Sequence, residues 1–147
     1  MTVDSAGFEF FDSNVIVYAL ACADDAESLR KKNVARRLLL DAAERNCAVI
    51  SAQVLSEAFV TLTRKSATPM APAEAAAHLR GIATTRVVPL TADVFFKAVE
   101  TQIRFQLSYW DSLILSAAES ARCGTVWSED LNDGQMYAGV RVRNPFK

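Results

Sequence analysis

The chain has 147 residues, of which 51% are hydrophobic and 22% charged, and its formal net charge is −1. This balance excludes a disordered or fibrous class, and the length predicts that residues 1–147 form a single domain with one core. The charge argues against a protein that grips nucleic acid through a strongly basic surface. It still allows a nucleic-acid substrate if the acids gather in one pocket with the bases around it.

Targeting and metal signals in the sequence are few. Every apolar run is shorter than the roughly 18 residues that a membrane span needs, and the N-terminal stretch has Asp4 and Glu9 in place of a basic signal segment. We therefore expect a cytoplasmic protein without membrane contact. The three cysteines are far apart and His78 is the single histidine, so we expect reduced, mostly buried thiols and no zinc site.

The first predicted elements are a strand, a turn and two helices. Residues 8–11 are aromatic and β-prone, and Ser13 and Asn14 are good N-cap residues for a helix over 15–21. Residues 26–44 have the apolar stripe of a long amphipathic helix. Basic side chains lie beside that stripe, and we interpret them as a solvated face, with a site for phosphates or a partner as the alternative: Arg30, Lys31, Lys32, Arg36 and Arg37.

The rest of the chain continues to alternate between short apolar runs and helical patterns. Residues 48–51 are continuously apolar, as in a strand buried on both faces of a parallel sheet. Further elements are a helix over 53–65, a helix opening at Pro72, a strand over 86–90, a helix from Thr91 to about 106, a helix opened by Asp111, a strand over 125–127 and an edge strand over 140–142. This alternation predicts an α/β protein, a three-layer α/β/α sandwich with a mainly parallel central sheet.

Acidic residues stand where the predicted strands end. Asp12 follows the first strand, Glu57 lies in the helix after the second, and Asp130 follows the strand over 125–127. Asp111 can reach the same edge from the start of its helix. In open α/β sheets the ligand crevice lies beyond the carboxyl ends of the strands, so we expect these four carboxylates to converge there.

Each acid also has a purely structural interpretation. Asp12 is a reasonable helix cap, Ser108 and Asp111 resemble a capping box, and Glu129 with Asp130 can be a polar turn. Glu57 lies at the border of an apolar stripe and is as compatible with a solvated position as with a ligand. Only their joint placement at one sheet edge favours a functional site.

Converging carboxylates without histidine or cysteine favour a hard cation, Mg²⁺ or Mn²⁺. Such an ion lowers the pKa of bound water and offsets phosphate charge, as phosphodiester hydrolysis requires. Glycine-rich nucleotide loops and a G-x-S-x-G nucleophile elbow are absent from the sequence. Trp110 and Trp127 flank the acids, and we interpret both as core residues in preference to base-stacking platforms.

Three segments resemble the motifs of PIN-domain ribonucleases. They read FFDSNVIVYAL, VLSEAF and SYWDSLILSAAESARCGTVWSEDL, in the family's order. The resemblance extends over nearly the whole chain. The ending, GVRVRNPF, resembles the tail of one bacterial group, the VapC-type toxins of toxin–antitoxin pairs.

The resemblance implies a metal-dependent endoribonuclease in which Asp12, Asp111 and Asp130 hold Mg²⁺ and Glu57 orients or deprotonates the attacking water. It also implies a homodimer and inhibition by a small VapB-like antitoxin whose C-terminal arm crosses the acidic groove. Four further residues are implied as supporting members, the last two as contacts of a second metal or an outer-shell water: Asn14, Ser128, Glu129 and Asp133.

Three alternatives stay open. An aspartyl-phosphate phosphatase needs D-x-D at the first strand, and Asp12-Ser13-Asn14 lacks the second acid. A phosphoacceptor receiver domain needs a second acid at the first strand and a lysine near the last, and neither is evident. The third is a non-catalytic PIN-like module whose acidic groove holds a basic partner peptide.

Overall fold

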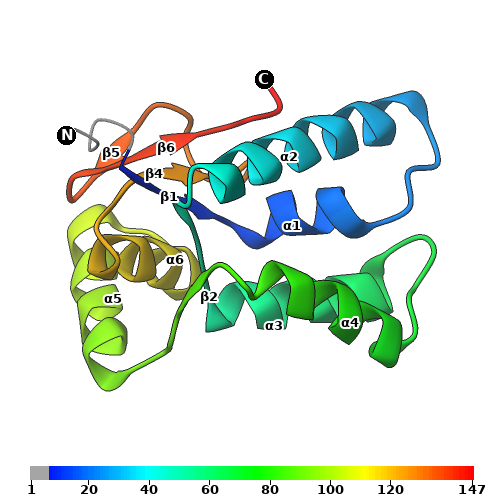
Figure 1. Ribbon diagram of the computed structural model, residues 1–147. Coiled ribbons are helices and arrows are strands. Elements are labelled where there is room, and N and C mark those ends of the chain that lie inside the picture. The colour runs from blue at the N-terminus through cyan, green and yellow to red at the C-terminus, as the bar shows by residue number, and fades with distance from the viewer. Residues whose placement is uncertain (1–6) are drawn as a thin grey trace.

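The computed structural model describes residues 7–147, and residues 1–6, Asp4 among them, lie outside the described part (Figure 1). One six-stranded sheet has the order β3-β2-β1-β4-β6-β5, in which the first five strands run parallel and β5 is antiparallel to β6. The strands are β1 (Phe8–Phe11), β2 (Ala48–Ser51), β3 (Arg86–Val88), β4 (Cys123–Trp127), β5 (Met136–Tyr137) and β6 (Val140–Arg143).

Strand β1 and its two neighbours, β2 and β4, form the middle of the core. In β1, Phe10 pairs with Val49 of β2 on one side and with Val126 of β4 on the other, and all three side chains are fully buried. Every residue of β2 is buried. A strand covered on both faces needs a continuous apolar run, which is the pattern of residues 48–51.

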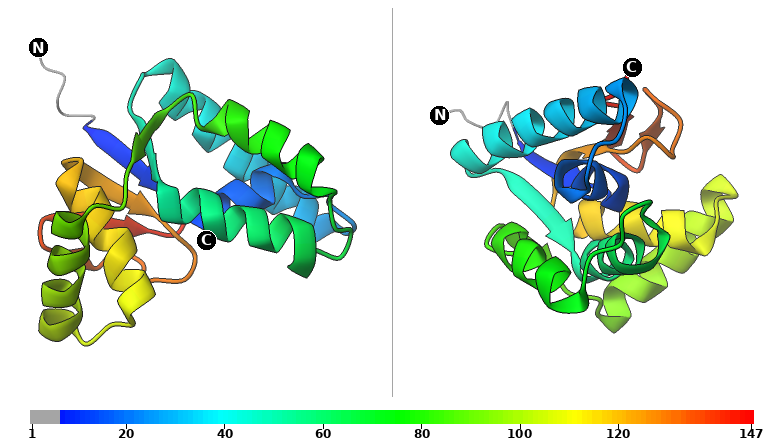
Figure 2. Two further views of the ribbon diagram at one scale, coloured as in Figure 1. Left: turned by 90° about the horizontal axis from the view of Figure 1, so that it is seen from below. Right: turned by 90° about the vertical axis from the view of Figure 1, so that its right-hand side faces the viewer.

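The helices make two outer layers. They are α1 (Ser13–Leu20), α2 (Ala26–Glu44), α3 (Ala52–Val60), α4 (Pro72–Ile82), α5 (Ala92–Phe105) and α6 (Tyr109–Ser120). Helices α1 and α2 lie together on one side of the sheet, α5 and α6 lie on the other, and α3 with α4 extends past the end of β2 beside α1 (Figures 1 and 2). The predicted three-layer α/β fold is therefore confirmed.

Helix α6 is the most buried helix of the described chain. Its seven consecutive residues from Ser112 to Ala118 are all buried, because α6 lies between the sheet and α5. Two serines inside this run satisfy their hydroxyls on backbone carbonyls: Ser112 donates to Ser108 at 2.8 Å and Ser116 donates to Val94 of α5 at 2.7 Å. None of the helices within residues 7–147 is both long and apolar enough to cross a bilayer.

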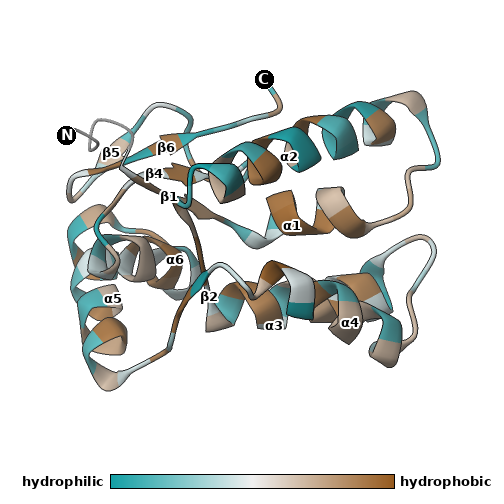
Figure 3. Ribbon diagram, in the orientation of Figure 1, coloured by the Kyte–Doolittle hydropathy of each residue, from teal (hydrophilic) through white to brown (hydrophobic). Residues whose placement is uncertain are grey.

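Helix α1 is apolar over most of its length, whereas α2 is largely hydrophilic (Figure 3). The N-cap of α1 is Asp12, one residue earlier than the predicted caps Ser13 and Asn14, because its side chain accepts the Ser13 backbone N–H at 2.7 Å. Two basic side chains of α2 reach the other end of α1: Lys32 donates to the Ala21 carbonyl at 2.7 Å and Arg36 to that of Ala19 at 2.9 Å.

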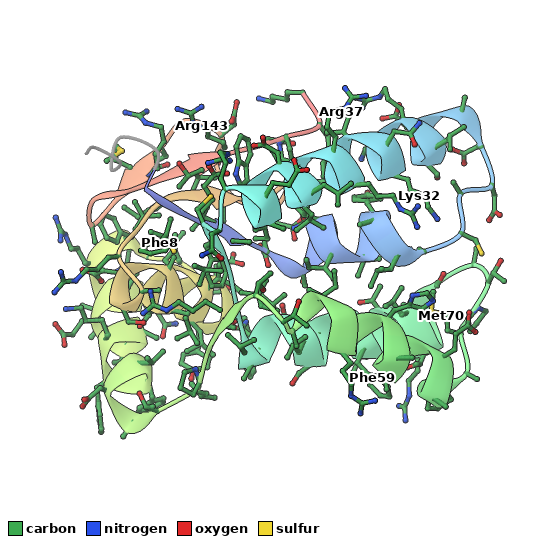
Figure 4. All side chains as sticks on the ribbon, in the orientation of Figure 1. Phe8, Lys32, Arg37, Phe59, Met70 and Arg143 are labelled. Atoms are coloured by element: carbon green, nitrogen blue, oxygen red, sulfur yellow. The ribbon has the colours of Figure 1, made fainter. Side chains whose placement is uncertain are left out.

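The prediction that the basic residues of α2 form a solvated face is therefore only partly correct, because Lys32 and Arg36 contact α1. In Figure 4, Lys32 extends toward the end of α1 while Arg37 points away from the molecule. Cations at a helix C-terminus complement its dipole and satisfy its last carbonyls. Part of this basic cluster therefore serves to hold α1 against α2.

Two further details differ from the predicted elements. Strand β5 was not predicted, and it makes β6 an inner strand instead of the edge strand expected over 140–142. Ala138 and Gly139 form the connecting turn with positive φ angles of 50° and 84°, and alanine is not a usual residue in that conformation. The helix predicted over 53–65 is α3 followed by one π-helical turn, Thr61–Lys65.

Candidate active site

A cavity of about 400 Å³ lies beyond the carboxyl ends of the central strands. Its lining includes the four acids that the sequence singles out: Asp12, Glu57, Asp111 and Asp130. They come from the end of β1, from α3, from the first turn of α6 and from the loop after β4. The parallel sheet places these four positions at one edge because β1, β2 and β4 are neighbours and run in the same direction.

Asp12 is the buried acid of the cavity, with 4% of its surface exposed. One carboxylate oxygen accepts the Ser13 N–H at 2.7 Å and the other accepts the Ser128 hydroxyl at 2.8 Å. The pKa of Asp12 is raised to about 7, mainly by burial and also by the negative charges of Glu57 and Asp130, against the two hydrogen bonds that lower it. At neutral pH the group therefore lies close to half protonation without a cation.

Glu57 is half-buried and is held by two side chains. Its Oε1 accepts the Ser13 hydroxyl at 3.1 Å, and its Oε2 accepts the Gln53 amide at 3.1 Å. The same Gln53 nitrogen lies 3.1 Å from the backbone carbonyl of Trp110 in α6. Gln53 thus connects the acid on α3 to the helix that presents Asp111.

Asp130 is exposed and is oriented by Asn14. The Asn14 amide donates to Asp130 Oδ2 at 3.1 Å, and its oxygen accepts the Glu129 N–H at 3.2 Å. The buried Ser128 hydroxyl accepts the Asp130 N–H at 3.1 Å while donating to Asp12. Asn14 and Ser128 therefore link the acid after β1 to the acid after β4.

Asp111 lies in the first turn of α6, where its backbone N–H donates to the Ser108 hydroxyl at 3.1 Å. This bond is half of the capping box suggested by the sequence. Burial raises the pKa of Asp111 and the charge of Asp130 adds to the rise, while the Ser108 hydroxyl lowers it. Asp111 is therefore both part of a helix start and a carboxyl group facing the cavity.

The structure places Glu129 and Asp133 away from the cavity. Glu129 accepts hydrogen bonds from the Lys31 ammonium and from the Tyr18 hydroxyl, at 2.5 and 2.9 Å. Asp133 accepts the backbone N–H of Asn144 at 2.8 Å. Both acids hold the loop after β4 to other parts of the fold.

The cavity is also lined by residues that were not predicted as part of a site, Gln53 and Lys65 among them. Both lie on the same helical segment as Glu57. The spacing of four residues from that acid is a signal for Gln53, whereas Lys65, eight residues after Glu57, has no such signal. Trp110 also lines the cavity and is 61% exposed, so its interpretation as a core residue is wrong. Trp127 is half-buried against the core and donates to Glu9 at 2.9 Å, as expected of a packed residue.

The donor set has the composition that a hard cation requires, because it consists of carboxylate, hydroxyl and amide oxygens. Within residues 7–147, however, no three Asp, Glu, His or Cys side chains are grouped closely enough to hold one ion by direct contact. Magnesium usually keeps several waters and takes only one or two carboxylates. The residues present therefore fit a hydrated ion bound by Asp12 and Asp130, with Asp111 contacting it through water.

Comparisons with known proteins agree with this architecture. The family model for the PIN domain matches residues 10–133, a span that contains all four acids of the cavity. No curated protein sequence matches the chain.

Similar solved structures include a toxin–antitoxin complex from Klebsiella pneumoniae, with a TM-score of 0.66, 18% identity and coverage of 93% of this chain and 97% of that one. The Mycobacterium tuberculosis toxin VapC20, which cleaves the sarcin–ricin loop, has a TM-score of 0.65, 24% identity and coverage of 90% and 98%. VapBC2 from Rickettsia felis bound to a promoter DNA fragment has a TM-score of 0.66, 18% identity and coverage of 93% and 98%. At these identities the likeness concerns the fold. On the family match, the chain belongs to the PIN domain family.

Proposed function

We propose that this chain, as a single PIN domain over residues 1–147, is a Mg²⁺- or Mn²⁺-dependent endoribonuclease that hydrolyses RNA phosphodiester bonds. The observation that supports it is the meeting of Asp12, Glu57, Asp111 and Asp130 around one cavity from four separate parts of the chain. A buried carboxyl group with neighbouring negative charges is costly to ionise, and a bound cation offsets that cost.

In the mechanism, Asp12, Asp111 and Asp130 would hold the ion, directly or through its waters, and the bound ion would supply Lewis acidity and lower the pKa of a water. Ser128 keeps Asp12 oriented by donating to one of its oxygens, and Asn14 does the same for Asp130. Glu57 orients the attacking water and accepts its proton. Ser13 and Gln53 each donate to one Glu57 oxygen, so the carboxylate is positioned before substrate arrives.

The first prediction concerns Asp12. Asp12→Asn preserves shape and the Ser13 hydrogen bond but removes the charge that binds the cation, so RNA cleavage should fall at least about a hundredfold while the circular dichroism spectrum stays unchanged. Asp133→Asn is the matched control, since Asp133 lies outside the cavity, and it should retain activity. Wild-type cleavage by the Asp12→Asn protein would reject the assignment.

Metal dependence separates the enzyme from a binding module. With Mg²⁺ the enzyme should cleave RNA, and chelator should stop it. A non-catalytic module that holds a basic peptide in the acidic cavity would instead bind its partner equally with and without metal. Metal-independent binding without RNA cleavage would therefore reject the enzyme function in favour of the binding module.

We further propose that the chain is a VapC-type toxin acting in the cytoplasm, with a small VapB-like antitoxin as its partner. Support comes from the toxin–antitoxin complexes among the structural neighbours, which align over at least 97% of their own length. The antitoxin's C-terminal arm would cross the acidic cavity. Expression of the chain alone should arrest bacterial growth, and co-expression of a short reading frame found directly upstream of its gene should restore it; growth unaffected by the active enzyme would contradict the toxin role.

A further inference from the structure

One wall of the cavity is a row of side chains spaced four residues apart. Gln53, Glu57, Thr61 and Lys65 all line it. In a regular α-helix, residues four apart are offset by about 40° around the axis. Over three such steps the offset is about 120°, which would carry the last residue away from the face that Gln53 occupies.

The π-helical turn at the end of this segment reduces the offset. The Ser66 N–H donates to the Thr61 carbonyl at 2.9 Å, five residues back instead of four. A turn that contains an extra residue rotates each residue through a smaller angle, so Lys65 stays close to the face of Glu57. Such π turns occur often at functional sites. The adjacent Arg64, by contrast, does not line the cavity.

Lys65 combines a place on the cavity wall with the lack of an ion-pair partner in the described part of the chain. It is the one basic side chain among the cavity-lining residues of the described chain, where it stands with four carboxylates. Lys65 forms no ion pair within residues 7–147, whereas Lys31 on α2 is paired with Glu129. Its side chain is exposed and free to meet a ligand that approaches from solvent.

We propose that Lys65 binds a backbone phosphate of the RNA strand that enters the cavity, an inference that rests on the proposed ribonuclease function. The carboxylates needed for the cation repel the phosphates of the substrate, and a mobile ammonium with three donors is a suitable counter-charge. The π turn holds this ammonium on the same wall as Glu57. Lys65 is thus a substrate-binding residue that sets where the strand lies relative to the hydrolytic water.

The test is equilibrium binding of a fluorescein-labelled, single-stranded RNA of mixed sequence, followed by anisotropy with Mg²⁺ present. Phosphate contacts are independent of sequence, so the natural target is not needed. All proteins carry Asp12→Asn to prevent cleavage. In this background Lys65→Gln should weaken binding about tenfold and lower the slope of log K against log salt by about 0.7, the value for one single-strand phosphate contact.

Two variants make the result specific. Lys65→Arg should restore binding to within about threefold, and Arg64→Gln, on the same turn, should change it by less than about twofold. Binding by Lys65→Gln that equals its parent in affinity and salt slope would overturn the inference alone, as would an equal loss in Arg64→Gln. Absence of RNA binding by the parent, together with absence of Mg²⁺-dependent cleavage by the wild type, would overturn the ribonuclease function and this inference with it.

Discussion

Asp12 shows how a buried carboxyl group conflicts with stability. It caps α1 with one oxygen and accepts Ser128 with the other, yet burial still raises its pKa to about 7. The unfolded chain releases this proton near pH 3.8. The folded state therefore holds a proton that the unfolded state has lost between these two values, and stability falls as pH rises through that window.

Removing the charge should consequently stabilise the metal-free protein. Asp12→Asn should raise the melting temperature in EDTA at pH 8, where the ionised carboxyl costs roughly 4 kcal/mol at most, and should change it little at pH 4. Differential scanning calorimetry of both proteins from pH 4 to 8 measures this. A stability difference that does not grow with pH would contradict the raised pKa.

Cation binding should depend on the same proton. Mg²⁺ competes with the proton on Asp12, so adding MgCl₂ should raise the wild-type melting temperature more at pH 8 than at pH 5.5. The Asp12→Asn protein should show a small shift at both values. Equal shifts for the two proteins at pH 8 would mean that the ion binds elsewhere.

The sequence predicted the acids of the cavity better than their surroundings. Asp12 directly follows β1 and Asp130 lies three residues after the end of β4. The strand ends of a parallel sheet meet at one edge, so both positions could be predicted. Trp110 precedes Asp111 in an apolar helix, so its pattern indicated a core position, while the side chain lies on the exposed side of the first turn. Lys65 depends on a π turn, for which the sequence has no established signal.

At the scale of elements, a polar network holds the loop after β4 against α1 and α2. The Lys31 ammonium bonds Glu129 and the Tyr18 hydroxyl, and it lies 4.8 Å from the Tyr18 ring centre and 5.4 Å from that of Phe146. The Tyr18 hydroxyl also donates to Glu129. Since Glu129 directly precedes Asp130, this network positions the loop that delivers one acid of the cavity.

Breaking that network should destabilise the fold. Lys31→Met leaves the half-buried Glu129 without its cation, so the free energy of unfolding should fall by about 1–3 kcal/mol. Lys97→Met is the control, because Lys97 and Glu119 are 4.0 Å apart at the surface, and it should cost less than about 0.5 kcal/mol. Urea unfolding of Lys31→Met, Glu129→Gln and the double variant measures the coupling, and additive effects would refute it.

The sequence predicted the types of the main helices and strands, but it did not predict β5, the edge strand beside β6. The helix over 26–44 and the strand over 48–51 have the predicted bounds, because a long amphipathic stripe and a short apolar run are strong local signals. Strand β5 has two residues and its turn contains Ala138 in a left-handed conformation. The turn also lacks the Asn-Gly or Asp-Gly pair by which a hairpin is normally predicted, so the sequence did not indicate this hairpin.

At the scale of the whole molecule, α5 presents large apolar side chains to solvent. Phe96 is 61% exposed and Ile103 is 67% exposed, and Phe95 stacks edge-on with Phe96 at 5.0 Å between ring centres. Exposed apolar groups gathered on one helix are typical of protein interfaces. They support the homodimer that the resemblance to VapC-type toxins implies.

We therefore expect sedimentation velocity to give twice the mass of one chain. Phe96→Asp should shift the protein to the monomer by burying an unpaired charge in the interface. Leu40→Asp is the control, since Leu40 is equally exposed on α2, on the opposite side of the sheet. A wild-type protein that sediments as one chain at tens of micromolar, an order of magnitude at which a stable dimer would persist, would exclude the dimer.

The two outermost strands bear on how the protein behaves at high concentration. At one border β3 has three residues and is followed at once by Pro89, and at the other β5 has two residues. Short edge strands and a nearby proline leave few unpaired backbone N–H and C=O groups with which a strand from another molecule could pair. Aggregation by sheet extension should therefore be slow, even though the interior of the sheet is built from continuous apolar runs.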